Sequence, residues 1–159
     1  MRDRFLVVIG CQREKLELID KKIKQSILDF INAESHNYTG VISIIRKRMN
    51  GDRNFQRSGD QVASDTNTYL DYESSNVIEV PGYDVDCNAF RRDAEYHLIG
   101  ISTSASVLTI AMSMYSVGLD VKVIEEYCED RKGKKLEEHA FEIMRAYMPG
   151  CLISRKELR

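Results

Sequence analysis

The sequence predicts an α/β protein, a three-layer sandwich in which a mainly parallel sheet of about six strands is flanked by helices. Short apolar runs alternate along the chain with segments whose apolar residues recur at helical spacing. The run at residues 5–10, FLVVIG, is apolar throughout, which is typical of a strand covered on both faces. The repeated order of strand, helix and strand indicates crossovers between parallel strands and a Rossmann-like topology.

Each element follows from the local pattern. Strands are expected at residues 5–10, 40–49, 76–80, 96–102, 121–127 and, as a short last strand, 151–154. Pro81 and Gly82 stop the third of them. Helical spacing predicts a first crossover helix through Leu16, Ile19, Ile23, Ile27, Phe30 and Ile31. A second helix is expected at 104–117, and a third follows Gly133 with Leu136, Ala140, Met144 and Tyr147 facing inward.

The length and composition fit one domain over residues 1–159, because 43% hydrophobic content suffices for a continuous core. One stretch breaks the pattern: residues 50–75 are polar and lack either periodicity. A loop of this length is typical of a lid, a binding loop or an oligomer contact, and a disordered insertion is the alternative. It leaves the sheet at the carboxyl end of the second strand, where open α/β sheets bind ligands.

Charge and apolar runs exclude several classes of function. The chain has 23 basic and 25 acidic residues, so its formal charge of -2 favours neither a nucleic-acid polymer nor a membrane surface. The run at residues 5–10 is far shorter than the roughly 20 residues that span a bilayer, and its flanks do not suit a signal peptide. We therefore expect a cytoplasmic protein.

The four cysteines indicate neither a disulfide framework nor a metal site. They are widely spaced, form no CxxC pair and have no histidine at zinc spacing: Cys11, Cys87, Cys128 and Cys151. We expect buried free thiols, and no metal or cofactor.

The segment Ser102 to Ser106 lies where a strand is expected to end and a helix to begin. Backbone N–H groups at such a turn favour an anion or a developing oxyanion. The alternative is purely structural, because Ser and Thr at this place are commonly helix caps.

The residues around this turn resemble a known family. Their order is similar to the signature of the isochorismatase-like cysteine hydrolases, which include nicotinamidases and N-carbamoylsarcosine amidohydrolase: Gly100, Thr103, Ser106, Val107, Thr109, Ala111, Gly118, Val121 and Val123. FLVVIGCQ resembles the family's opening V-I-D-x-Q strand, and VIEVPGY resembles its K-P-G-Y segment. The resemblance extends to the closing helix from Lys134 to Met148 and the GCLISRKEL segment.

The resemblance implies a chemistry that needs an aspartate, a lysine and a cysteine. Here those positions are Gly10, Val80 (or Glu79 if the register slips by one) and Ser106. A serine hydroxyl is a poor nucleophile without an adjacent base, which Gly10 cannot supply. The sequence therefore indicates a degenerate member, a pseudoenzyme that keeps the pocket without the chemistry.

Two further features of the family are its metal ligands and a cis peptide bond. The D-x-H metal ligands of nicotinamidases are not recognisable, because His36, His97 and His139 lie outside the corresponding segment. Family members also have a cis peptide bond at the place that corresponds to Ile101 and Ser102, and the sequence leaves its presence open. We expect His97, inside a strand, to be a packed or capping histidine rather than a base.

A displaced nucleophile is the alternative to lost chemistry. Cys11 and Cys87 both lie near the expected site, and Asp84 or Asp86 could act as base. The favoured interpretation is that both thiols are small buried hydrophobes, a role in which free cysteine is common.

The charges near the expected ligand edge predict an anionic or planar small molecule, for example a nucleotide or an aromatic acid. Five cations lie within twelve residues: Arg46, Lys47, Arg48, Arg53 and Arg57. A solvated charged loop is the alternative. The predicted ligand-binding residues are Gln12, Arg46, Arg48, Arg53, Tyr83, Ser102, Thr103 and Ser106. Tyr69, Tyr72 and Tyr83 could stack on a planar ligand or pack at subunit contacts.

Three hypotheses follow. The chain is a non-catalytic binder of a small molecule; or it is an active hydrolase of an amide or related bond through Cys87, Cys11 or Ser106; or it is a structural or partner-binding subunit. By the same resemblance we expect a homodimer or homotetramer, with the helix at 104–117 or the long loop at the contact.

Overall fold

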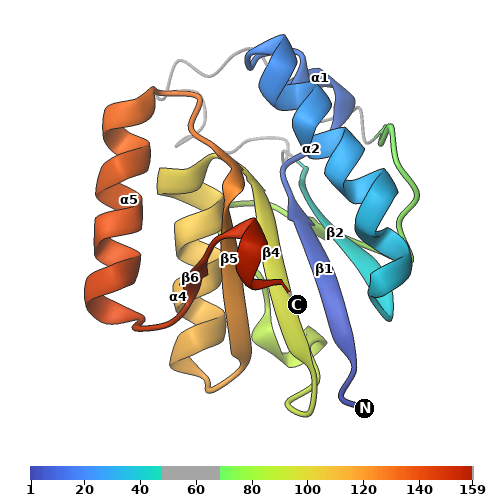
Figure 1. The fold of residues 1–159 in the computed structure, drawn as a ribbon, viewed down its shortest axis with the longest axis vertical. Coiled ribbons are helices and arrows are strands. Elements are labelled where there is room, and N and C mark those ends of the chain that lie inside the picture. Colours follow the sequence, from blue (N-terminus) through green and yellow to red (C-terminus); the bar gives the residue numbers. More distant parts are fainter. Residues whose placement is uncertain (48–68, 159) are drawn as a thin grey trace.

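The computed structural model describes residues 1–47 and 69–158. Its sheet has six strands in the order β3-β2-β1-β4-β5-β6, and all five neighbouring pairs are parallel. The strands are β1 Arg4–Ile9, β2 Gly40–Arg46, β3 Asn76–Val80, β4 Glu95–Ile101, β5 Asp120–Glu129 and β6 Leu152–Ile153. The predicted fold class is thus confirmed (Figure 1).

Helices cover both faces of the sheet. The α-helices are α1 Arg13–Leu16, α2 Lys21–Glu34, α4 Leu108–Ser116 and α5 Lys134–Tyr147. Short turns of other helix types lie at η1 Ser35–Asn37, η2 Cys87–Ala89, η3 Thr103–Val107 and η4 Arg155–Glu157. Figure 1 shows α2 on one side of the sheet and α4 with α5 on the other. None of the helices among the described residues is long and apolar enough to cross a bilayer.

Strand β1 is buried on both faces, as its apolar run predicts. Leu6 and Val8 belong to the core under α2, whereas Val7 and Ile9 belong to the core under α4 and α5. All four side chains are at most 1% exposed. Burial on both faces is why this strand lacks alternating polar residues.

The first crossover is broken, where the sequence predicted one helix from Leu16 to Ile31. Helix α1 ends at Leu16, and α2 begins only at Lys21. Asp20 explains the break, because its carboxylate accepts from Lys22 N at 2.8 Å and so caps a new helix. Ile27, Phe30 and Ile31 are buried as predicted.

The inward face of α5 is rotated from the predicted one. Ala140 and Met144 are buried as expected, but Leu136 is 41% and Tyr147 72% exposed. Glu137 and Phe141 face inward instead. The reason is the hydrogen bonding of Glu137, described below, which an apolar pattern does not contain.

Strand ends also differ from the predicted ones. β2 ends at Arg46 rather than residue 49, and β5 continues to Glu129, beyond the expected end at 127. Of the polar stretch at 50–75, only residues 69–75 lie within the described part of the chain. Tyr72 there is buried against the α2 face, with its hydroxyl 2.8 Å from Ser43 Oγ.

Candidate functional site: a basic cleft at the carboxyl edge of the sheet

A cleft lies where parallel sheets place their ligands. The chain runs from β1 outward to β3 and then returns to β4 on the other side of β1, so the strand order reverses between β1 and β4. Ligands of open α/β sheets bind beyond the carboxyl ends of the strands at such a point. Here a cleft of about 420 Å³ is lined by residues that follow or end β2, β4 and β5.

Basic side chains dominate the described lining of this cleft. Lys15 and Arg46 come from α1 and the end of β2, and Arg131 and Lys132 come from the turn after β5. The remaining lining includes Tyr83, Leu136 and the turn formed by Ser102, Ser104, Ala105 and Ser106. The arrangement can bind an anion, because cations from both sides converge on one concave surface.

The three positions that correspond to the family's catalytic residues do come together. Gly10, Val80 and Ser106 all line a recess that adjoins the cleft and shares Lys15, Arg46, Tyr83 and Ser106 with it. The recess has a volume of only about 10 Å³, which is about the space of one water molecule. The three positions therefore lie together, with room for about one water molecule among them.

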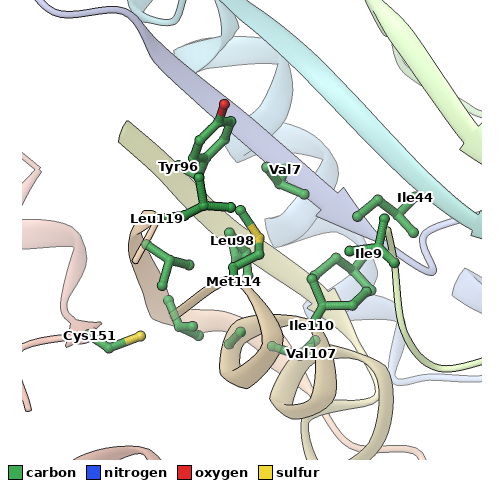
Figure 2. Close-up of a cluster of buried hydrophobic side chains, with 14 of the residues drawn as sticks. Val7, Ile9, Ile44, Tyr96, Leu98, Val107, Ile110, Met114, Leu119 and Cys151 are labelled. Carbon is green, nitrogen blue, oxygen red and sulfur yellow. The ribbon is translucent and has the colours of Figure 1, made fainter. Parts of the chain in front are cut away.

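Apolar side chains fill the space around these positions. Ile9, Ile44 and Ile110 line the recess together with Val80. Figure 2 shows Ile110 of α4 facing Ile9 and Ile44, which lie at the ends of two neighbouring strands. The interior of this recess is thus continuous with the hydrophobic core between the sheet and α4.

Gly10 cannot be replaced by a larger residue on this backbone. Its φ is +65°, and a Cβ placed on it would overlap the carbonyl oxygen of Ile101. β1 and β4 approach each other closely here, since Ile9 pairs with Gly100. The backbone conformation at this position therefore suits glycine and disfavours any residue with a side chain.

The turn after β4 contains the cis peptide bond whose presence the sequence left open. The Ile101–Ser102 peptide bond is cis, and Thr103–Val107 form a π-helical turn that leads into α4. Ser102, Ser104 and Ser106 line the cleft, whereas Thr103 is completely buried beneath it. Of the predicted ligand-binding residues of this turn, only Thr103 is held away from the cleft.

Asp130 supplies a carboxylate at this turn. It follows β5, is 4% exposed and lines the cleft. Its Oδ2 accepts from Ser104 N at 2.7 Å and its Oδ1 accepts from Lys132 N at 2.9 Å. The Ser104 N–H, one of the backbone donors predicted to bind an external anion, is thus already bound to a side chain of the protein.

Glu137 holds the same turn from behind. Its Oε2 accepts from Asp130 N at 3.0 Å and from the Thr103 hydroxyl at 3.5 Å. Its Oε1 accepts from Lys134 Nζ at 2.8 Å, and this hydrogen bond raises the pKa of Lys134. The first turn of α5 therefore fixes both walls of the cleft, the one after β4 and the one after β5.

The tyrosines differ in position. Tyr83 lines the cleft, and the guanidinium of Arg46 lies 4.5 Å from the centre of its ring. Tyr69 contacts Arg13 in the same way at 5.5 Å. Neither Tyr69 nor the buried Tyr72 lines the cleft, so only Tyr83 is placed to stack on a bound ligand.

Gln12 supports the cleft without lining it. It is 2% exposed, and its Nε2 donates to the carbonyl of Arg46 at 3.2 Å. Arg48 and Arg53, the other predicted ligand-binding residues, lie outside the described residues, as does Arg57. The remaining cation of that group, Lys47, pairs with Glu79 at 3.5 Å.

The cysteines are not placed as nucleophiles. Cys11 is fully buried in the core under α2, and burial raises its pKa to about 12. Cys87 is half-buried, and its pKa is raised by burial and then by the carboxylates of Asp84 and Asp86. Neither thiol lines the cleft or the recess.

The part of the chain that the structure describes offers no cluster of metal ligands. Within residues 1–47 and 69–158, no group of three or more His, Cys, Asp or Glu side chains could hold an ion. The three histidines lie on η1, β4 and α5, and His97 on β4 is 3% exposed, packed as predicted.

Comparisons with solved structures define the fold. The nicotinamidase of Bacillus subtilis superposes with a TM-score of 0.74 at 14% identity, covering 96% of this chain and 99% of its own. An isochorismatase-like hydrolase from Alkaliphilus metalliredigens gives 0.74 at 11% identity, covering 96% and 94%. The chain thus has the isochorismatase-like fold, which confirms the resemblance at the level of structure.

Among proteins of this fold, nicotinamidases and pyrazinamidases recur. The pyrazinamidase of Pyrococcus horikoshii, solved in complex with zinc, superposes with a TM-score of 0.74 at 14% identity and covers 96% of this chain and 99% of its own. No protein-family model and no curated protein matches the sequence.

Sequence reasoning missed the residues that follow β5. Asp130, Arg131 and Lys132 line the cleft, as does Lys15 of α1. The signal was available, because β5 is parallel to β4 and its carboxyl end must reach the same edge of the sheet. The segment CEDRKG at 128–133 carries the charges there.

Proposed function

We propose that this protein is a non-catalytic binder of an anionic small molecule, which it holds in the cleft at the carboxyl edge of the sheet. The observation that carries this proposal is the contrast between two adjoining spaces. The recess at Gly10, Val80 and Ser106 measures about 10 Å³, whereas the basic cleft beside it measures about 420 Å³. This contrast in volume supports binding in the cleft over a reaction among the three positions of the recess.

The hydrolase alternative has little support. Ser106 lines the cleft, but the position that corresponds to the family's base is occupied by Gly10. Both candidate cysteines, Cys11 and Cys87, lie away from the cleft, and their pKa values are raised. Loss of a catalytic group that acts in concert costs on the order of 10⁶ in rate in a well-characterised hydrolase. We therefore expect no turnover of nicotinamide.

Binding is tested by isothermal titration calorimetry with pyrophosphate and with benzoate at low ionic strength. Arg131→Ala and Lys132→Ala should each weaken pyrophosphate binding by roughly 10-fold, because each removes one charge from the cleft. Lys135→Ala is the matched control, since Lys135 is exposed on α5 and does not line the cleft. Equal losses in all three variants, or no binding to the wild type, would refute the proposal.

Catalysis is tested separately by following nicotinamide and ester cleavage at high enzyme concentration. The expected result is a rate equal to that of the buffer. Cleavage that disappears in Ser106→Ala or Cys87→Ala would establish the hydrolase instead.

The homo-oligomer expected from the sequence remains a prediction. It is supported by apolar side chains exposed on and after α4: Met112 at 38%, Tyr115 at 39% and Val117 at 42%. A native mass spectrum reports the oligomeric state and any retained small molecule together, and a monomer would contradict this expectation.

A further inference from the structure

The described lining of the cleft contains one carboxylate, that of Asp130. This side chain is 4% exposed, and its position is fixed by two hydrogen bonds from backbone N–H groups, those of Ser104 and Lys132. A carboxylate has about four lone-pair sites, so Asp130 can accept further hydrogen bonds from a molecule in the cleft.

The donors of the turn after β4 are largely used within the protein. Ser104 N–H is bound to Asp130, and the N–H groups of Ala105 and Val107 donate to the carbonyl of Ser102 at 3.1 and 3.2 Å. A compact anion at this turn would find these N–H groups already bound within the protein, and the negative charge of Asp130 would repel it. The anionic group of a ligand therefore belongs with the cations on the walls of the cleft, away from Asp130.

We infer that the ligand is an anion that also carries a nitrogen–hydrogen donor, an amine or amide, which binds to Asp130 while the anionic group binds to the basic side chains. This inference rests on the proposed function of the same cleft. Asp130 is then a specificity-determining residue: it selects against simple anions and for amphoteric ones. Tyr83 and Leu136, which also line the cleft, suit the apolar part between the two groups.

The test compares benzoate with 2-, 3- and 4-aminobenzoate by calorimetry on the wild-type protein. These probes share a carboxylate and a ring and differ only in the presence and place of one N–H donor group. At least one isomer should bind about 10-fold more tightly than benzoate, because a hydrogen bond to a buried carboxylate is strong. This comparison needs no variant, so it decides the inference even if changes at Asp130 disturb folding.

Asp130→Asn should reverse the selectivity, favouring the simple anion and weakening the preference for the amino group. The isosteric amide removes the negative charge, so pyrophosphate should bind about 5-fold more tightly and the preference for the amino group should fall to about 2-fold or less. Glu138→Gln removes an exposed charge from α5 outside the cleft and should change neither value.

The two proposals fail in different ways. If pyrophosphate and benzoate bind but no aminobenzoate is preferred, or if the preference persists in Asp130→Asn, the role of Asp130 is overturned and the binding cleft stands. If none of the probes binds to the wild-type protein, both proposals are overturned.

Discussion

At the level of a single residue, the backbone at Gly10 limits which side chains the recess beside the cleft can hold. Its left-handed backbone conformation and the carbonyl oxygen of Ile101, which occupies the place that a Cβ would need, exclude any side chain there, the family's aspartate included. An aspartate introduced at this position therefore does not fit the present backbone.

Replacing Gly10 with Ala or Asp should destabilise the protein by about 2–4 kcal/mol, because it combines a left-handed conformation with a backbone clash. Gly82→Ala is the matched control: Gly82 has no positive φ and no atom within 4 Å of its Cβ position. Urea denaturation measures both. A Gly10→Ala variant as stable as Gly82→Ala would show that the two strand ends move apart readily.

The cysteines give a second prediction at this scale. Burial raises the pKa of Cys11 to about 12 and that of Cys151 to about 11, and it also raises the pKa of Cys128. Iodoacetamide at pH 7.5 should therefore modify only Cys87, slowly, and reach the other three after unfolding in urea. Mass spectrometry of tryptic peptides identifies the site. Complete modification of any cysteine within minutes at pH 6 would reveal an activated thiol.

At the level of elements, the cleft is assembled by the start of α5. Glu137 connects β5, through Asp130 N, with the turn after β4, through the Thr103 hydroxyl. These hydrogen bonds explain why Glu137, and not Leu136, lies on the inward face of the helix. The two cleft walls depend on a contact between segments that are 34 residues apart, Thr103 and Glu137.

Glu137→Gln tests this contact. An amide offers one acceptor oxygen where two are in use, so its NH2 group faces a donor in either orientation: Lys134 Nζ on one side, or Asp130 N and the Thr103 hydroxyl on the other. We expect a loss of about 1–3 kcal/mol in unfolding free energy. Glu138→Gln on the exposed side of α5 should stay within about 0.5 kcal/mol of the wild type. Equal stability of both variants in urea would mean that Glu137 does not hold the turn.

At the level of the whole molecule, we expect the pH dependence of stability to reflect a buried histidine in the half of β4 remote from the cleft. His97 Nε2 contacts the carboxylate of Glu95, and His97 Nδ1 lies 3.0 Å from the Tyr38 hydroxyl. A carboxylate only accepts, so Nε2 carries the proton and Nδ1 accepts from Tyr38. Burial lowers the pKa of His97 below its ordinary value, against the opposing effect of Glu95.

Because the folded pKa of His97 is lowered, the unfolded chain binds this proton first as the pH falls. Unfolding free energy should therefore decrease from about pH 6.5 downward, by up to about 1.4 kcal/mol per pH unit. The pKa of Glu95 is also lowered overall: burial raises it, but His97 and Arg4 outweigh this effect. The contribution of Glu95 to the unfolding free energy is lost only in more acidic solution, as the pH falls below the ordinary pKa of a glutamate.

Urea denaturation between pH 7 and 5 measures this slope. The slope should be largely absent in His97→Asn and retained in His139→Asn, because His139 is exposed on α5. An unchanged slope in His97→Asn would assign the acid sensitivity to other groups.

The sequence by itself determined the layered parallel sheet and the turn after β4. Apolar runs and helical spacing reflect burial on one or two faces, which is a local property of strands and helices. It also placed Gly10, Val80 and Ser106 at one site, because the carboxyl ends of neighbouring parallel strands meet.

The tertiary structure alone decided that this site is closed and that the cleft lies beside it. The volume left between Ile9, Ile44, Val80 and Ile110 depends on how three strands and α4 pack together, and no single segment contains that information. The same holds for Asp130 and Glu137, whose hydrogen-bond partners belong to other elements. The sequence shows which side chains are polar, but only the folded structure determines the hydrogen-bond partner of each buried polar group.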